Sequence, residues 1–308
     1  MPVGLTRGGA TTADRPQAIK AVPVRHTGQL VSAVLIAAAV AALVWSVATN
    51  ETLQWSVVGD NLFAPTVLEG LLVTLELTVL AMVVGIVLGI LLAVMRLSSN
   101  RVLRVVSAGY IWLFRGTPVL VQLILWYNLG LIFPVLGVGS FSVETNTLIT
   151  PFAAALLGLA LNEGAYMAEV VRAGILAVDS GQSEAAHALG LTRSQTLRGI
   201  VLPQAMRVII PPTGNETITM LKTTALVAVI AANDLLTRVQ AIYATNFAII
   251  ELLLVASFWY LVLTTVSTVG QYYLERRFAR GSTAAAGPGA VTRLMTNLRP
   301  GRQTARAR

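Results

Sequence analysis

Several ionisable side chains lie inside apolar segments that are long enough to cross a bilayer. One such segment, Leu161–Arg172, reads LNEGAYMAEVVR. Within it, Asn162, Tyr166 and Glu169 follow an i, i+4, i+7 spacing, which aligns them on one face of a helix. Charged groups are costly in hydrocarbon unless they pair or line a wet cavity. The chemistry that such a face offers is therefore the binding of a charged or polar solute.

The two glutamates of this segment receive different interpretations. Counting about 1.5 Å per residue from Pro151 places Glu163 near the middle of the membrane. Glu163 either lines a substrate path or forms a buried bond between helices, and both interpretations are open. Glu169 can pair with Arg172 one turn on, near the cytoplasmic surface, which is the plainer interpretation of that residue.

Arg115 lies in a second polar position within an apolar segment, beside Gly116 and Pro118. Proline removes a backbone hydrogen bond, so a broken or kinked helix is expected here. Irregular backbone at membrane depth is tolerated where protein or a cavity satisfies the freed groups. The arginine then either forms a structural ion pair, with Glu76 or Glu163 as partner, or contacts an anion directly.

A third polar position is Lys222, one of only two lysines in the chain. Its compact ammonium suits a carboxylate, either of the protein or of a bound amino acid. The tandem Pro211–Pro212 is expected to interrupt the start of the same segment, and Asn215, Glu216 and Thr219 add polar groups to it.

The segment from about residue 66 carries two acidic residues and two glycines of interest. Glu69 and Glu76 lie seven residues apart and share a face. Glu69 is expected in the outer headgroup region, and Glu76 lies deeper, which makes it the more telling of the two. Gly85 and Gly89 form a small-xxx-small pattern that predicts close helix packing.

The sequence lacks the residues that several other activities need. A phosphate-binding loop requires Gly-Lys-Ser/Thr, and neither Lys20 nor Lys222 follows a glycine. The two histidines, His26 and His187, are too far apart to build a metal site, and there is no cysteine. No hydrolytic arrangement of serine, histidine and acid is present either. We therefore expect no enzyme activity, cofactor or metal in this chain, and energy must come from a partner or a gradient.

Composition indicates that these residues are positioned by membrane helices. Of 308 residues, 55% are apolar and 12% are charged, which argues against a soluble domain. The net charge of +8 does not indicate nucleic acid, because the basic residues lie between hydrophobic segments and in the tails. We predict an all-α membrane protein with six spans at about 29–49, 66–95, 104–133, 150–176, 204–231 and 247–275.

The distribution of basic residues orients these spans. The predicted loops 50–65 and 134–149 contain no Lys or Arg, and 232–246 contains only Arg238. The other side is rich in arginine, and carries Arg7, Arg15, Arg25, Arg96, Arg101, Arg104, Arg193, Arg198, Arg207, Arg276, Arg277 and Arg280. The positive-inside rule thus predicts that both termini and the stretch around Glu184 are cytoplasmic.

The ends of the chain differ from the predicted spans. The tails 1–28 and 278–308 lack a hydrophobic pattern and are predicted to be disordered, the second of them basic. The first helix, 29–49, has an apolar run longer than that of a signal sequence and a long leader, so we predict a retained helix.

The stretch of about 179–203 is predicted to form two short helices around Gly190. Glu184, Ala185, Ala186 and Leu189 make a compact amphipathic turn, and Gly190 permits a tight change of direction. Thr192 can cap a second helix that ends before Pro203. Small residues would let this loop enter a groove on another protein, although periodicity alone fits a folded connector equally well.

Five stretches, in this order, resemble the polar amino acid family of ABC-importer permeases, the group of histidine, glutamine and arginine permeases. They are FRGTPVLVQ from Phe114, GAYMAEVVRAGI from Gly164, GQSEAA from Gly181, LPQAMR from Leu202 and PTGNE from Pro212. The resemblance covers about 66–277 and includes the cytoplasmic EAA loop of that family.

The resemblance implies a MetI-like transmembrane domain with a five-helix core, plus one extra N-terminal helix in this chain. It implies a second permease subunit, identical or paralogous, and two cytoplasmic ABC ATPases that bind ATP and Mg. It also implies an extracytoplasmic amino-acid-binding protein and a bacterial inner membrane. Under this resemblance Glu184, Ala185, Ala186 and Gly190 belong to the ATPase-coupling motif, which we extend to Leu202 and Pro203.

Two departures from the family bear on specificity. The first helix has no assigned role, and the chain reads Lys222-Thr223-Thr224-Ala225-Leu226 where relatives often have an aspartate after the lysine. We expect a permease for a polar amino acid whose side-chain charge stays open. The expected path or gate residues are Arg115, Asn162, Glu163, Tyr166, Glu169 and Lys222.

Two other classes of protein compete with this prediction. A gradient-driven secondary amino acid transporter would carry protons on Glu76 or Glu163. A membrane-anchored scaffold would show no substrate-stimulated ATPase activity in any complex. The EAA loop weighs against both.

Overall fold

The computed structural model describes residues 27–137 and 142–278, in two units that we treat separately. The first unit contains one helix, α1 (Thr27–Ala48), whose window Val31–Ala48 is apolar enough to span a membrane. Its side chains from Val31 onward are exposed, which suits a helix that faces lipid. The predicted disorder of both tails lies outside the described residues, apart from the helical Thr27, Gly28 and Phe278.

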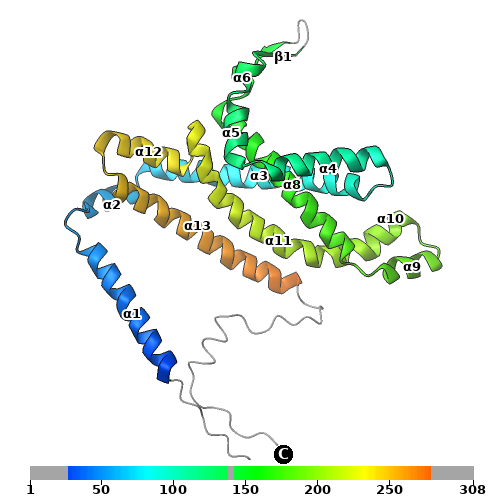
Figure 1. Ribbon diagram of the computed structural model, residues 1–308, viewed down its shortest axis with the longest axis horizontal. Coiled ribbons are helices and arrows are strands. Elements are labelled where there is room, and N and C mark those ends of the chain that lie inside the picture. The colour runs from blue at the N-terminus through cyan, green and yellow to red at the C-terminus, as the bar shows by residue number, and fades with distance from the viewer. Residues whose placement is uncertain (1–26, 138–141, 279–308) are drawn as a thin grey trace, which may run out of the picture. The chain divides into compact units, whose positions relative to one another are not determined.

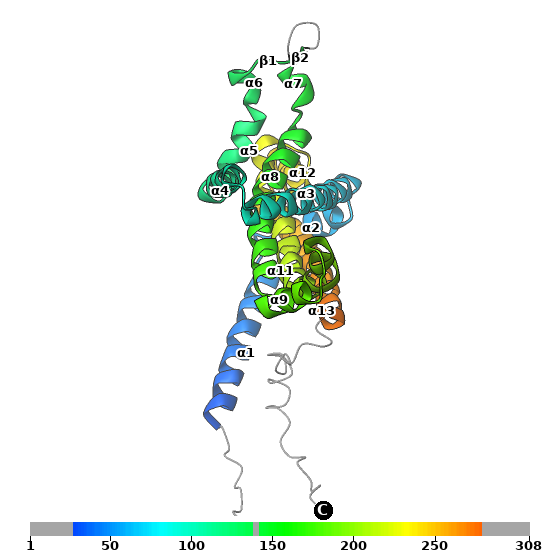
Figure 2. The same ribbon diagram turned by 90° about the vertical axis from the view of Figure 1, so that its right-hand side faces the viewer.

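The second unit, from Gln54 onward, is a bundle of helices with one small hairpin (Figures 1 and 2). In chain order its elements are α2 (Trp55–Leu62), α3 (Pro65–Leu97), α4 (Arg101–Gly116), α5 (Val119–Tyr127), α6 (Leu129–Ile132), β1 (Val135–Leu136), β2 (Val143–Glu144), α7 (Thr145–Leu148), α8 (Pro151–Leu176), α9 (Ser180–Ala188), α10 (Arg193–Thr196), a π-helical turn (Leu197–Val201), α11 (Leu202–Thr223), a 3₁₀ helix (Thr224–Ile230), α12 (Leu235–Asn246) and α13 (Ile249–Phe278). The two short strands pair antiparallel, with Val135 opposite Glu144.

Four of the described helices could cross a membrane unaided, namely α1, α3, α8 and α13. Two bent pairs raise the number to six if each pair forms one span: α4 with α5, bent by 100°, and Arg193–Ile230 with α12, bent by 45°. The fold is therefore a helical membrane fold with four to six candidate spans. The outward faces of α3 and α13 are apolar and exposed, for example at Val83 and Leu261, as lipid contact requires.

The third predicted segment, 104–133, is not one continuous helix. Thr117 is extended (φ −114°, ψ 141°) because the ring of Pro118 disfavours a helical residue before it. α4 therefore stops at Gly116, and α5 starts after the proline in a direction that differs by 100°. A broken or kinked helix was expected at this proline, and the structure has a full break.

The tandem proline in α11 behaves in the opposite way to expectation. Pro211 and Pro212 lie inside an uninterrupted helix that runs from Leu202 to Thr223. The prediction that they interrupt this segment is wrong. Gln271 of α13 contacts this stretch, since its Nε2 lies 3.4 Å from the Pro211 carbonyl oxygen and 2.9 Å from Asn215 Oδ1.

α3 and α8 pack closely because glycines remove side chains from their interface. A Cβ at Gly85 would lie 2.6 Å from Glu163 Cγ, and one at Gly89 would lie 2.5 Å from Met167 Cβ. The small-xxx-small pattern therefore does what its spacing predicts. A core that includes Leu77, Leu123 and Leu159 adjoins this interface and joins α3, α5 and α8.

Candidate functional site

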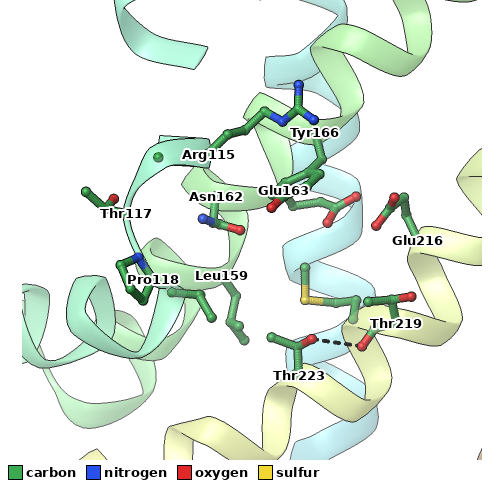
Figure 3. Close-up of a pocket in the computed structure, with 13 residues that line it drawn as sticks. Arg115, Thr117, Pro118, Leu159, Asn162, Glu163, Tyr166, Glu216, Thr219 and Thr223 are labelled. Carbon is green, nitrogen blue, oxygen red and sulfur yellow. Dashed lines mark hydrogen bonds between the residues drawn. The ribbon is translucent and has the colours of Figure 1, made fainter. Parts of the chain in front are cut away.

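A cavity of about 590 Å³ opens where the break between α4 and α5 meets α8 and α11 (Figure 3). Its polar wall contains an arginine, two glutamates, an asparagine, a tyrosine and three threonines. The lining residues are Arg115, Gly116, Thr117, Pro118, Val119, Leu159, Asn162, Glu163, Tyr166, Glu216, Thr219, Met220 and Thr223. Segments up to about 100 residues apart in sequence thus meet at one intramembrane cavity.

Arg115 reaches the cavity from the last turn of α4. Its guanidinium carbon lies 5.0 Å from the centroid of the Tyr166 ring, a cation–π contact between α4 and α8. Within the described residues Arg115 forms no ion pair with Glu76 or Glu163. The predicted ion pair with Glu76 or Glu163 is therefore not formed. The guanidinium faces the Tyr166 ring instead and interacts electrostatically with Glu216 and Glu169.

Glu163 lies one turn before Tyr166 on α8 and is only 4% exposed. Its Oε1 is buried and has no hydrogen-bond partner among the described residues. Glu216 of α11 lies across the cavity, close enough for the two carboxylates to interact electrostatically (Figure 3). Buried polar atoms are normally paired. Glu163 therefore stands out as a buried acid with an unpaired oxygen beside a second acid. The alternative of a bond between helices has no described partner.

Asn162 lines the cavity and also holds the helix break together. The Phe114 carbonyl, four residues before Pro118, loses its helical donor because proline has no N–H. Asn162 Nδ2 donates to this oxygen at 2.8 Å, and Gln122 Nε2 donates to it at 3.0 Å. Gln122 also donates to Thr117 Oγ1 at 2.7 Å. The break is thus satisfied by side chains and keeps its shape without a ligand.

Two of the predicted path residues lie elsewhere. Glu169 pairs with Arg172 at 2.6 Å, as the plainer interpretation predicted, and does not line the cavity. Lys222 is exposed and also does not line it. Lys222 follows Glu216 by six residues, which places it about 120° away around the helix. Their assignment to the path stays a prediction that the cavity does not support.

Several lining residues were not among the predicted site residues. Glu216, Thr219 and Thr223 follow an i, i+3, i+7 spacing, which is the signal that could have singled out this face of α11. From the sequence, Gln122 could be identified only as a member of the FRGTPVLVQ stretch, because its role depends on the break at Pro118.

The acidic residues of α3 contribute nothing to the cavity. Glu69 lies 3.6 Å from Arg238 of α12, an ion pair at the end of the bundle. Glu76 is exposed on the outward face of α3. The cavity therefore does not support the interpretation of Glu76 as the more telling acid, since Thr74 and Thr78 occupy the buried face of α3.

The stretch 179–203, which we call the Glu184 loop, forms two short helices around Gly190. Asp179 Oδ1 accepts from Gly181 N at 2.7 Å and caps α9. Gly190 is left-handed (φ 78°), and Thr192 caps α10 in a reciprocal capping box with Gln195. The predicted turn and cap are confirmed.

The outer surface of the Glu184 loop combines small and apolar residues with polar and charged ones, such as His187, Arg193 and Arg198. Glu184 and Ala185 are exposed, Leu189 is 82% exposed, and Ala186 is buried against the loop itself. The prediction that the second helix ends before Pro203 is wrong. This helix continues through the π-helical turn into α11, and Pro203 lies in the first turn of α11.

Comparison with known proteins identifies the fold and the class. Residues 85–280 match the family described as "Binding-protein-dependent transport system inner membrane component". The arginine transport system permease protein ArgU of Corynebacterium glutamicum is 47% identical over 277 residues, 89% of this chain and 87% of the relative. The L-cystine transport system permease protein TcyB of Bacillus subtilis is 36% identical over 74% of this chain and 92% of its own length.

A solved structure adds the three-dimensional likeness. The crystal structure of an amino acid ABC transporter with histidines has a chain that is 38% identical to this one, with a TM-score of 0.62. The alignment covers 70% of this chain and 95% of the other. The family match includes the cavity residues and the Glu184 loop, which are both within residues 85–280.

Proposed function

Because the chain belongs to the family of binding-protein-dependent transport system inner membrane components, we propose that its cavity conducts a polar amino acid. The chain is the permease component of an amino acid ABC importer and a multi-pass membrane protein. The observation that carries the proposal is the placement of opposite charges in one intramembrane cavity.

The charges of the cavity suit the two ends of an amino acid. Arg115 offers a guanidinium to an α-carboxylate, which it can bind in a bidentate manner. Glu163, an acid at the cavity wall, offers a carboxylate to an α-ammonium. A cavity of about 590 Å³ has the size of ordinary small-molecule sites. The second carboxylate, Glu216, makes the lining net acidic and favours a substrate with a cationic side chain.

Asn162 and Tyr166 complete the proposed path as positioning groups. Asn162 fixes the α4–α5 break, and Tyr166 holds the Arg115 guanidinium over its ring. Both contacts would keep the arginine in place between turnovers.

The Glu184 loop is the proposed contact with a separate cytoplasmic ABC ATPase. Its exposed Glu184, Ala185 and Leu189 can enter a groove, and the turn at Gly190 sets the angle between its helices. Leu202 and Pro203 would pass the motion into α11, which carries Glu216 to the cavity. ATP and Mg would be bound by the ATPase dimer alone.

The same proposal assigns topology and partners. With six spans, both termini and the Glu184 loop would lie on the cytoplasmic side of a bacterial inner membrane. The arginine-rich stretches on that side agree with this orientation. The core is 66–277, with 29–49 as an extra helix. A second permease subunit, identical or paralogous, and an extracytoplasmic binding protein would complete the importer.

The test is uptake by proteoliposomes that contain the chain, the ATPase and the binding protein encoded beside it. Labelled arginine, glutamine and cystine are compared, with ATP supplied on the ATPase side. We expect uptake that requires ATP and all three proteins, with arginine preferred. Uptake by the chain alone under a pH gradient would instead support the gradient-driven transporter and overturn the proposal.

A further inference from the structure

A second hollow lies between the end of α3 and the start of α4, and it shares no lining residue with the substrate cavity. It is a groove of about 680 Å³. Arg96 comes from the last turn of α3, and Arg101 and Arg104 come from the first turn of α4. The two helices pack against one another (Figure 1), so three guanidinium groups line one open groove.

The positive charge of this groove is not balanced by the protein. All three arginines are exposed, and none forms an ion pair within the described residues. Arg96 interacts electrostatically with Glu169, but that carboxylate is already engaged by Arg172 at 2.6 Å. The first turn of α4 contains no acid, so the positive end of its dipole adds to the arginines. Such an arrangement attracts an anion.

The rest of the groove is apolar and runs along α4 away from the charges. Val105 is 70% exposed and Trp112 is 76% exposed. Between them Gly109 has open space where a Cβ would stand, which deepens the groove floor. Trp112 lies eight residues beyond Arg104, a distance of about 12 Å along a helix. The groove therefore joins a cationic head to an apolar channel about two turns long.

From this pairing we propose that the groove binds an anionic phospholipid, with its phosphate at the three arginines and an acyl chain along Gly109 and Trp112. The site goes beyond the proposed amino acid transport and lies outside the substrate cavity. Basic pockets between membrane helices on the cytoplasmic side suit such headgroups, and the proposed topology places the three arginines there. A soluble phosphate compound would use the arginines but not the apolar floor.

The test measures lipid binding to the full-length chain in detergent, by native mass spectrometry at fixed ionic strength. The probes are phosphatidylglycerol, phosphatidylcholine and glycerol 3-phosphate, the last being a headgroup without acyl chains. We expect phosphatidylglycerol to bind at least about tenfold more tightly than phosphatidylcholine. Replacing Arg96, Arg101 and Arg104 by Gln should weaken phosphatidylglycerol binding about 100-fold, or about fivefold for each arginine.

Two further variants separate charge from shape. Replacing Arg193, Arg198 and Arg207 by Gln removes the same charge elsewhere on that side and should leave the affinity for phosphatidylglycerol unchanged. Gly109→Leu fills the groove without altering charge, at a position where a Cβ has open space, and should weaken phosphatidylglycerol binding several-fold. Thermal unfolding of each variant establishes that it is folded.

Three results would overturn the proposal. The first is wild-type affinity in the variant that lacks Arg96, Arg101 and Arg104. The second is an equal loss in the variant that lacks Arg193, Arg198 and Arg207, which would assign the effect to net charge. The third is competition by glycerol 3-phosphate as effective as that of the intact lipid, because the apolar floor would then contribute nothing.

Discussion

The substrate cavity and the Glu184 loop differ in where the residues that build them come from and in which groups they leave exposed. The cavity gathers side chains from α4, α5, α8 and α11 and leaves Glu163 Oε1 without a partner. The loop is built from 25 consecutive residues whose ends are satisfied by their own neighbours, through Asp179 and the Thr192–Gln195 capping box.

The two regions differ in which of their groups are left without a partner in the protein. In the cavity these groups are charged and line an enclosed space. In the loop they point outward and include a large apolar side chain, Leu189, which is 82% exposed. The cavity is therefore suited to a small charged solute and the loop to a protein surface.

The largest expected effect breaks the packing behind the cavity. Gly89→Leu would press a side chain against the backbone of α8, since a Cβ there already lies 2.9 Å from Ala168 N. We expect a loss of about 3 kcal/mol or more in the free energy of unfolding, measured by the yield and melting temperature of purified protein. Gly109→Leu is the matched control, because its Cβ meets nothing. Equal damage from both variants would contradict the described helix interface.

The second effect sharpens the role of charge in the cavity. Glu163→Gln keeps the shape of the side chain and removes its charge. Loss of a charged hydrogen bond to substrate should lower kcat/KM for uptake by the complete importer about 10- to 100-fold. Glu76→Gln removes an acid from the exposed face of α3 and should leave uptake unchanged. If Glu76→Gln lowered uptake more than Glu163→Gln, the functional acid would lie outside the cavity.

The third effect concerns the turn of the loop. Ala at Gly190 must adopt φ near 78°, at a cost of about 1–2 kcal/mol. Amides of residues 186–192 should therefore exchange with deuterium about 5- to 30-fold faster, measured by hydrogen-exchange mass spectrometry. At Gly199 φ is not positive and a Cβ also meets nothing, so Gly199→Ala should produce no such change. If the exchange rates in Gly190→Ala match the wild type, the left-handed turn is not required.

The smallest effect is expected at the ion pair between the two regions. Glu169 and Arg172 are partly exposed, with 26% and 32% of each side chain accessible. Pairs of this kind contribute about 1 kcal/mol or less. Glu169→Gln should therefore shift the melting temperature only slightly and leave uptake intact. A loss of uptake as large as that of Glu163→Gln would restore Glu169 to the substrate path.

The sequence predicts the loop better than the cavity, for a physical reason. Caps, the glycine turn and the small-residue surface depend on neighbours within a few residues, so Thr192 and Gly190 could be assigned from the sequence alone. The glycines of the α3–α8 interface carry a pattern that is equally local.

The cavity depends on tertiary geometry that no local pattern specifies. Intramembrane polarity singled out Arg115, Asn162, Glu163 and Tyr166, and all four line it. The same criterion also selected Lys222, which lies on another face of α11. Pro118 predicts a break but not its angle of 100°. Only that angle brings Gln122 to the Phe114 carbonyl.

The unbroken course of α11 has a mechanical consequence. Its 22 residues form a rod about 33 Å long, with Pro203 at one end and Thr223 of the cavity at the other. A tilt of about 5° at the loop end would displace the far end by about 3 Å, the scale of a hydrogen bond. The tandem proline removes two backbone bonds near the middle of this rod, and Gln271 braces it from α13. The stiffness of α11 at this contact with Gln271 would determine how much of each movement of the Glu184 loop reaches the solute in the cavity.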